Sequence, residues 1–207
     1  VSAYAISAGV SGLVAAGFAD KFDRKKLLLF FYAGFVIGTL LCGIAPDYNS
    51  LLWARIITGI FAGVIGSISF AIITDLFKME VRGRVMGFVQ MSFAASQIMG
   101  IPAGLLLADK LGWHSPFIKI VVISAIVGIF LIFYLKPVDA HLKVKSERNP
   151  VAHLFKTLFT PRYLKTFAAT TLLATGGFML MPFGTAFSVN NLGIQRKELF
   201  IMYLVVG

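Results

Sequence analysis

The charged residues of this chain are confined to short clusters between long uncharged stretches. The uncharged stretches are residues 1–19, 27–46, 56–74, 85–108, 120–135 and 166–195, and a further apolar stretch covers 199–207. A helix needs about 20 apolar residues to cross a bilayer, and it satisfies its backbone hydrogen bonds internally, as lipid requires. The pattern therefore predicts six membrane-spanning helices and the beginning of a seventh.

Composition leads to the same fold class. With 58% hydrophobic and 14% charged residues and a mean hydropathy of +0.86, the chain is too apolar to cover its own core in water. We predict an all-α membrane protein.

The histidines lack metal-ligand spacing, the single cysteine, Cys42, lies in an apolar stretch, and no nucleophile has a base near it in the sequence. We therefore expect no enzymatic activity, no metal and no other cofactor.

The basic residues predict the orientation in the membrane. A net charge of +10 would suggest a nucleic-acid partner in a soluble protein, but Lys and Arg gather in the loops at 17–26, 77–84 and 137–165, whereas the loop at 46–50 has none. By the positive-inside rule the three basic loops are cytoplasmic, and we expect a multi-pass protein of a bacterial-type inner membrane and no nucleic-acid partner. The loop containing Arg196 and Lys197 departs from the alternation.

The chain begins without Met inside one apolar stretch and ends inside another, so we expect a piece of a longer protein. We divide it into an N-terminal half at 1–136, a cytoplasmic linker at 137–165 and the start of a C-terminal half at 166–207. Between Pro150 and Pro161, apolar residues recur at helical spacing and predict an amphipathic helix on the membrane surface. Such a helix either binds a partner or forms a lipid-facing strut between the halves.

Glycines four residues apart predict close helix packing. These pairs are Gly34 and Gly38, Gly59 and Gly63, Gly83 and Gly87, and Gly100 and Gly104. Small residues at this spacing let helix backbones approach closely in lipid. Together with Pro102 and Pro182 inside predicted spans, they indicate helices that bend or slide against one another, as transporter helices do.

The first loop carries the most specific motif. Residues 16–26 read A-G-F-A-D-K-F-D-R-K-K, which resembles G-x-x-x-D-[RK]-x-G-R-[RK]-[RK] between the second and third helices of the major facilitator superfamily. The motif's acidic residue corresponds to Asp20 and its arginine to Arg24, whereas Ala16 and Asp23 replace its glycines. We expect Asp23 to make the turn after Phe22, because Asp tolerates left-handed geometry better than most residues.

Two further stretches resemble the same superfamily in the expected order. Arg55-x-x-x-Gly59-x-x-x-Gly63 resembles its fourth-helix motif, and Gly100-Ile101-Pro102-Ala103-Gly104 resembles a motif of the bacterial drug and arabinose-type efflux permeases, the drug:proton antiporter branch. In the following Gly112-Trp113-His114, the histidine replaces that branch's usual arginine. The resemblance implies helices two to seven, and the beginning of eight, of a twelve-helix bundle with two halves.

The resemblance also implies a cluster of gating charges. Its members would be Asp20, Arg24, Asp75, Arg82 and Arg84. We expect charge-assisted hydrogen bonds among them to hold one arrangement of the helices until the cavity changes side. Alternatively, these residues are ordinary charges that mark topology by reaching the membrane surface.

Arg55 stands inside a predicted span, where an ionised side chain costs roughly 2.5 to 3.5 kcal/mol near the helix centre. One interpretation is that it faces the cavity and couples proton movement to substrate by acting on a carboxylate elsewhere. The other is that it reaches the outer interface, since it lies close to Ser50 in the sequence.

In this family the cavity walls come from helices one, four, seven and ten. The resemblance therefore gives as candidate lining residues Ser67, Ser69, Thr170, Thr171, Thr175, Met179 and Phe183. Polar groups among soft apolar surfaces suit an amphiphilic solute of modest size. Each of these residues alone can equally serve helix packing.

These observations lead to one functional hypothesis and two rivals. The hypothesis is a monomeric, proton-coupled efflux transporter that moves small organic molecules across the bilayer by alternating access. The nearest rival is an uptake symporter for a sugar or other nutrient from the same superfamily. The more distant rival is a membrane sensor or structural protein that transports nothing.

Overall fold

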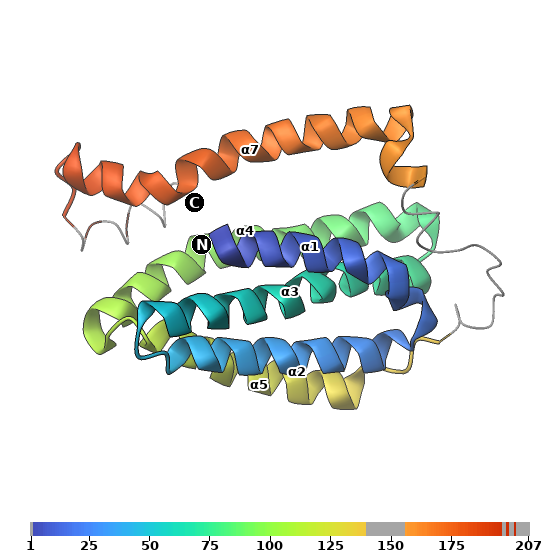
Figure 1. Cartoon of the computed structure of the whole chain (residues 1–207), viewed down its shortest axis with the longest axis horizontal. Coiled ribbons are helices and arrows are strands. Elements are labelled where there is room, and N and C mark those ends of the chain that lie inside the picture. Colours follow the sequence, from blue (N-terminus) through green and yellow to red (C-terminus); the bar gives the residue numbers. More distant parts are fainter. Residues whose placement is uncertain (1, 140–155, 196–197, 199–200, 202–207) are drawn as a thin grey trace. The chain divides into compact units, whose positions relative to one another are not determined.

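The computed structural model describes residues 2–139, 156–195, 198 and 201. The described helices are α1 (Ser2–Phe18), the 3-10 turn η1 (Ala19–Lys21), α2 (Arg24–Gly43), α3 (Tyr48–Leu76), α4 (Met79–Leu111), α5 (Ser115–Tyr134) and α7 (Pro161–Asn190), as Figure 1 shows. Within these residues the secondary structure is entirely helical. The predicted fold class, an all-α membrane protein, is confirmed.

Five of these helices are long and apolar enough to cross a membrane: α1 with η1, α2, α3, α4 and α5. The sixth predicted span, at 166–195, corresponds to α7, which has 30 residues. Of the predicted amphipathic helix between Pro150 and Pro161, residues 156–159 are helical and residues 150–155 lie outside the described residues, as does most of the apolar stretch at 199–207.

Aspartates begin two of the spans. Asp47 precedes α3, and its carboxylate accepts hydrogen bonds from the backbone N–H of Ser50 at 2.7 Å and from the Ser50 hydroxyl at 2.6 Å. These bonds hold the pKa of the Asp47 carboxyl below its ordinary value. Because of this cap, α3 starts well before the uncharged stretch does and carries Arg55 inside it.

Asp23 caps α2 in the same way, and our expectation of left-handed geometry there is wrong. Its φ is −57° and its side chain accepts the backbone N–H of Lys26 at 3.1 Å. The residue that replaces the motif's glycine therefore serves as a helix N-cap rather than as a left-handed turn residue. Among the described residues, φ is positive only at Gly112 and Gly193.

The structure forms two compact units. The first contains α1, α2, α3, α5 and both ends of α4, and the second contains the middle of α4 (Ser92–Leu106) with α7. Within the first unit, α3 packs against α1 and α2, and α2 also packs against α5 (Figure 1). The residues discussed below as gating and coupling candidates all lie in this unit.

Glycine sets the distance between α3 and α1. A Cβ atom at Gly63 would overlap the carbonyl oxygen of Ala8 and the hydroxyl of Ser11, and a Cβ at Gly59 would overlap the Ser7 hydroxyl. The two backbones therefore touch, as the spacing predicts. By contrast, Cβ atoms at the predicted α4 pairs, 83 with 87 and 100 with 104, would meet no described atom within 4 Å.

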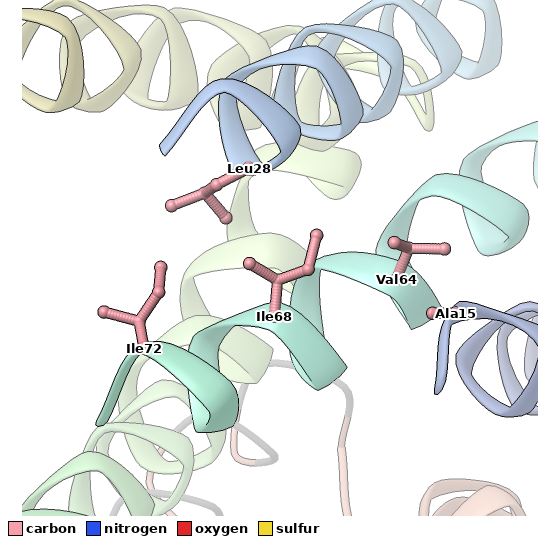
Figure 2. Close-up of a cluster of buried hydrophobic side chains, with 5 residues drawn as sticks. All are labelled: Ala15, Leu28, Val64, Ile68 and Ile72. Carbon is pink, nitrogen blue, oxygen red and sulfur yellow. The ribbon is translucent and has the colours of Figure 1, made fainter. Parts of the chain in front are cut away.

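A small apolar core joins the three helices α1, α2 and α3. It consists of Ala15, Leu28, Val64, Ile68 and Ile72. Figure 2 shows Leu28 of α2 directed toward Ile68 and Ile72 of α3, while Ala15 of α1 lies beside Val64. Many other large apolar side chains are exposed, such as Phe133 at 79%. Exposure of that kind is expected where the solvent is lipid rather than water.

The close approach of α1 and α3 predicts opposite effects for two glycines of the same helix. We expect Gly63→Ala to lower the free energy of unfolding by about 1 to 3 kcal/mol, because the new methyl group has no room. The matched control is Gly66→Ala, since a Cβ there meets nothing within 4 Å and alanine favours the helix by about 1 kcal/mol. Thermal unfolding midpoints of the full-length protein in detergent would compare them, and equal midpoints would contradict the close packing.

Candidate functional site

Arg24 lies at the centre of a cluster of opposite charges. It is the first residue of α2 and is buried, with 5% exposure. Its Nη2 atom is 2.8 Å from Oδ1 of Asp20 in η1, and its Nε atom is 3.1 Å from Oδ2 of Asp75 in the last turn of α3. We call Asp20, Arg24 and Asp75 the charge cluster. It connects the end of α1, the start of α2 and the end of α3 through one guanidinium group.

The two ion pairs of the charge cluster differ in their access to solvent. The Asp20 side chain is 64% exposed, whereas that of Asp75 is 21% exposed. Solvent screens an exposed pair to a fraction of a kcal/mol, while a partly buried pair with a hydrogen bond contributes more. The Arg24 to Asp75 pair is therefore the stronger one. Arg24 Nη1 is also buried and has no hydrogen-bond partner among the described residues.

The other two predicted gating residues occupy different positions. Arg82 donates from Nη2 to the carbonyl oxygens of Thr74 at 2.7 Å and Phe77 at 3.3 Å. The last carbonyls of a helix lack partners and favour a nearby cation, so Arg82 stabilises the end of α3 that carries Asp75. Arg84 is exposed near the start of α4. Both basic residues thus follow Asp75 closely in the sequence, and Arg82 supports the end of α3 through main-chain oxygens.

Arg55 lies near the start of α3, and its guanidinium group contacts two aromatic rings. Its Cζ atom is 4.6 Å from the ring centroid of Phe117 on α5 and 5.9 Å from that of Tyr4 on α1. Each such contact contributes about 0.5 to 2 kcal/mol, so two of them offset most of the cost of the charge in a span. In the described part of the chain, both ion pairs belong to Arg24, and Arg55 has no carboxylate partner.

The aromatic partners of Arg55 are not predictable from the sequence pattern. The available signal was weak: one aromatic residue near the predicted outer end of each of two other spans, Tyr4 and Phe117. Aromatic residues are common at membrane interfaces for reasons unrelated to arginine. Only the three-dimensional structure shows that these two rings, from α1 and α5, contact the same side chain of α3.

The serines proposed to line a cavity bond within or between helices. Ser67 is half-buried, and its hydroxyl contacts the carbonyl oxygens of Gly12 at 3.2 Å and Gly63 at 3.3 Å. It thereby joins α1 to α3, which favours the packing interpretation. The hydroxyl of Ser69 donates to Ile65 of its own helix at 2.8 Å.

The remaining cavity candidates belong to α7. Thr170 and Thr175 donate to the carbonyl oxygens four residues before them, and both are exposed, as are Thr171 and Phe183. The side chain of Met179 lies outside the described residues. Their assignment to a substrate cavity stays a prediction.

Comparison with known proteins identifies the family. The profile of the Major Facilitator Superfamily matches residues 1–207. The chain belongs to the Major Facilitator Superfamily. It is a multi-pass membrane protein of a transporter family rather than an enzyme family, and the resemblance found in the loop motif is confirmed at this level.

Three relatives show the range within this superfamily. The chain is 38% identical to Multidrug resistance protein 3 of Bacillus subtilis over 129 residues, which are 62% of this chain and 25% of that protein. It is 31% identical to the uncharacterised MFS-type transporter YceJ of the same organism over 209 residues, covering 100% of this chain and 53% of that protein. It is 33% identical over 134 residues to the vacuolar membrane amino acid uptake transporter fnx2 of Schizosaccharomyces pombe, covering 65% and 23%. The chain thus spans about half the length of YceJ and a smaller share of the other two.

The unequal exposure of the two acidic partners predicts unequal effects on stability. We expect Asp75→Asn to lower the free energy of unfolding by about 3 kcal/mol, because it leaves the buried Arg24 short of its better shielded counter-charge. Asp20→Asn, the matched control, should cost less than about 1 kcal/mol, because water already screens that pair. Denaturation of the full-length protein in detergent would measure both. A larger loss of stability for Asp20→Asn than for Asp75→Asn would mean that the Arg24 to Asp20 pair is the stronger one.

Proposed function

We propose that this chain forms part of a proton-coupled efflux transporter for small organic molecules that works by alternating access. The observation that carries the proposal is the charge cluster, in which the buried Arg24 joins three helix ends at the predicted cytoplasmic side. The likeness to Multidrug resistance protein 3 supports export as the direction and an amphiphilic solute as the cargo. A bacterial-type inner membrane, with loops 17–26, 77–84 and 137–165 cytoplasmic, and a monomeric state complete the proposal.

The charge cluster acts in this proposal as a reversible clamp. Asp20 is largely exposed, so water replaces its bond to Arg24 at low cost, whereas the bond to Asp75 is better shielded. Opening on the cytoplasmic side therefore separates Arg24 from Asp20 first, while Arg24 stays with α3. Such a pair stabilises one of two states by a small amount, as a switch between comparable populations requires.

This role predicts that a neutral residue at position 20 changes transport without changing insertion. We expect Asp20→Asn to slow solute flux by roughly two- to five-fold, since this exposed pair contributes less than about 1 kcal/mol and about 1.4 kcal/mol corresponds to a factor of ten. Flux would be measured in proteoliposomes, and the amount of protein in the membrane would serve as the control. Unchanged flux at equal protein amount would reject the clamp.

Arg55 supplies the proposed link to protons. Its aromatic neighbours offset the cost of burying it but carry no net charge, so its field extends to nearby titratable groups. An arginine near a carboxylate lowers the pKa of that carboxylate and favours proton release. We propose that the carboxylate is supplied by the full-length transporter, and that solute binding alters its distance from Arg55.

Proton coupling predicts the direction of solute movement in a pH gradient. An efflux antiporter moves its solute against the proton flow, so proteoliposomes with an acidic interior should accumulate a drug-like solute until a protonophore removes the gradient. We expect Arg55→Ala to abolish this accumulation and Arg55→Lys to weaken it, because lysine keeps the charge but loses the planar contact with the rings.

The same assay tests the competing functions. The likeness to fnx2, which is named as an uptake transporter for amino acids, favours the symporter as the second candidate. A symporter moves its solute with the proton flow, so accumulation would require an acidic exterior. Wild-type coupling in both Arg55 variants would refute the role of Arg55. Absence of flux for drugs, sugars and amino acids alike would favour a protein that transports nothing.

A further inference from the structure

The chain that follows α5 returns to the start of α2. Helix α5 ends at Tyr134, because Pro137 cannot continue a helix and keeps the residue before it extended. Val138 is then buried, with 5% exposure, and its carbonyl oxygen accepts the backbone N–H of Arg24 at 3.2 Å. The sequence pattern places this residue in the predicted linker between the halves, at 137–165.

This contact satisfies a group that a helix leaves unpaired. The first N–H groups of a helix have no acceptor within the helix. In α2 the Asp23 carboxylate accepts the N–H of Lys26, and Val138 accepts that of Arg24. Arg24 is therefore held twice, through its main chain by Val138 and through its side chain by the two aspartates of the charge cluster.

Two further contacts fix the same end of α5. The ammonium group of Lys25 donates to the carbonyl oxygen of Ile132 at 2.8 Å, in the last turn of α5. A cation is favoured there because the final carbonyls of a helix are unpaired and partly negative. Leu135 also packs against the apolar core that includes Ala15 and Leu28. Ile132 thus contacts Lys25, Val138 contacts Arg24, and Leu135 contacts this core. We call these three contacts the α5 junction.

We propose that the α5 junction positions Arg24 for the charge cluster, with Lys25 and Val138 as its positioning residues. Ordering the backbone of a residue costs conformational entropy, and the α5 junction orders the backbone of Arg24 independently of its bridge to the two carboxylates. The end of α5 fixes the start of α2 through the main chain of Arg24, and the guanidinium group of the same residue reaches Asp20 and Asp75. This inference rests on the proposed gating role of the charge cluster.

The motif offers a matched pair of lysines for the test. Lys25 bonds to Ile132, whereas its neighbour Lys26 is exposed, so Lys25→Ala and Lys26→Ala remove the same charge from the first turn of α2. In proteoliposomes of the full-length protein, we expect Lys25→Ala to slow flux by roughly five-fold, the factor that one hydrogen bond contributes. Lys26→Ala should leave flux unchanged, and Lys25→Arg should restore it because arginine donates to the same carbonyl. Equal flux in the two alanine variants would overturn the proposal.

A double-mutant cycle separates positioning from a purely structural role. If Lys25 acts through Arg24, Lys25→Ala should slow flux little further in a protein that already carries Asp20→Asn. A second cycle combines Lys25→Ala with Asp75→Asn and measures unfolding midpoints, which can be determined even when flux is slow. Additive effects in both cycles would mean that Lys25 only caps α5. If Asp20→Asn alone leaves flux unchanged, the gating proposal fails, which is a different result.

The backbone contact is tested at the other side of the α5 junction. Val138→Gly removes the buried side chain and frees the main chain, and Asp139→Gly adds the same freedom at an exposed neighbour. We expect slower flux in the first variant and wild-type flux in the second. If Val138→Gly does not reach the membrane, the comparison of flux in Lys25→Ala and Lys26→Ala tests the proposal instead. Equal flux in two well-inserted glycine variants would contradict the assignment of Val138.

Discussion

The close contact between the backbones of α1 and α3 is the constraint on which the rest of the first unit depends. Lipid gives no hydrophobic drive for helices to associate, so contact requires small residues, and Gly59 and Gly63 provide them. Because α1 lies this near, the hydroxyl of Ser67 reaches Gly12, and the ring of Tyr4 reaches Arg55. At the opposite end the same pairing brings η1 beside the end of α3, where Arg24 bridges their aspartates.

The sequence predicted the features that lipid imposes directly. Charged groups must leave the hydrocarbon, so the uncharged stretches located the spans, and the loop motif located Asp20 and Arg24. Hydropathy marks only the part of a helix that lipid covers, which explains why α3 starts earlier than its uncharged stretch. The prediction for the turn at Asp23 is wrong because the sequence does not distinguish an aspartate that caps a helix from an aspartate with left-handed backbone geometry.

The features that were not predictable depend on which helices are neighbours. Apolar periodicity is weak when most faces meet lipid, so it did not show that Phe117 of α5 and Tyr4 of α1 both contact Arg55. It also did not distinguish Gly63, which touches another backbone, from Gly104, which meets no described atom. Val138 was assigned to a connecting segment because its role depends on a main-chain oxygen, and a main-chain oxygen has no signature in the sequence.

Aromatic rings hold a cation without cancelling its charge. A carboxylate beside Arg55 would have formed a neutral pair, whereas Phe117 and Tyr4 leave a full positive charge at that end of α3. The same end of α3 also carries the carboxylate of its cap, Asp47. An acidic group that approaches Arg55 is therefore stabilised in its ionised form by a cation that no bound counter-ion in the described part of the chain has neutralised.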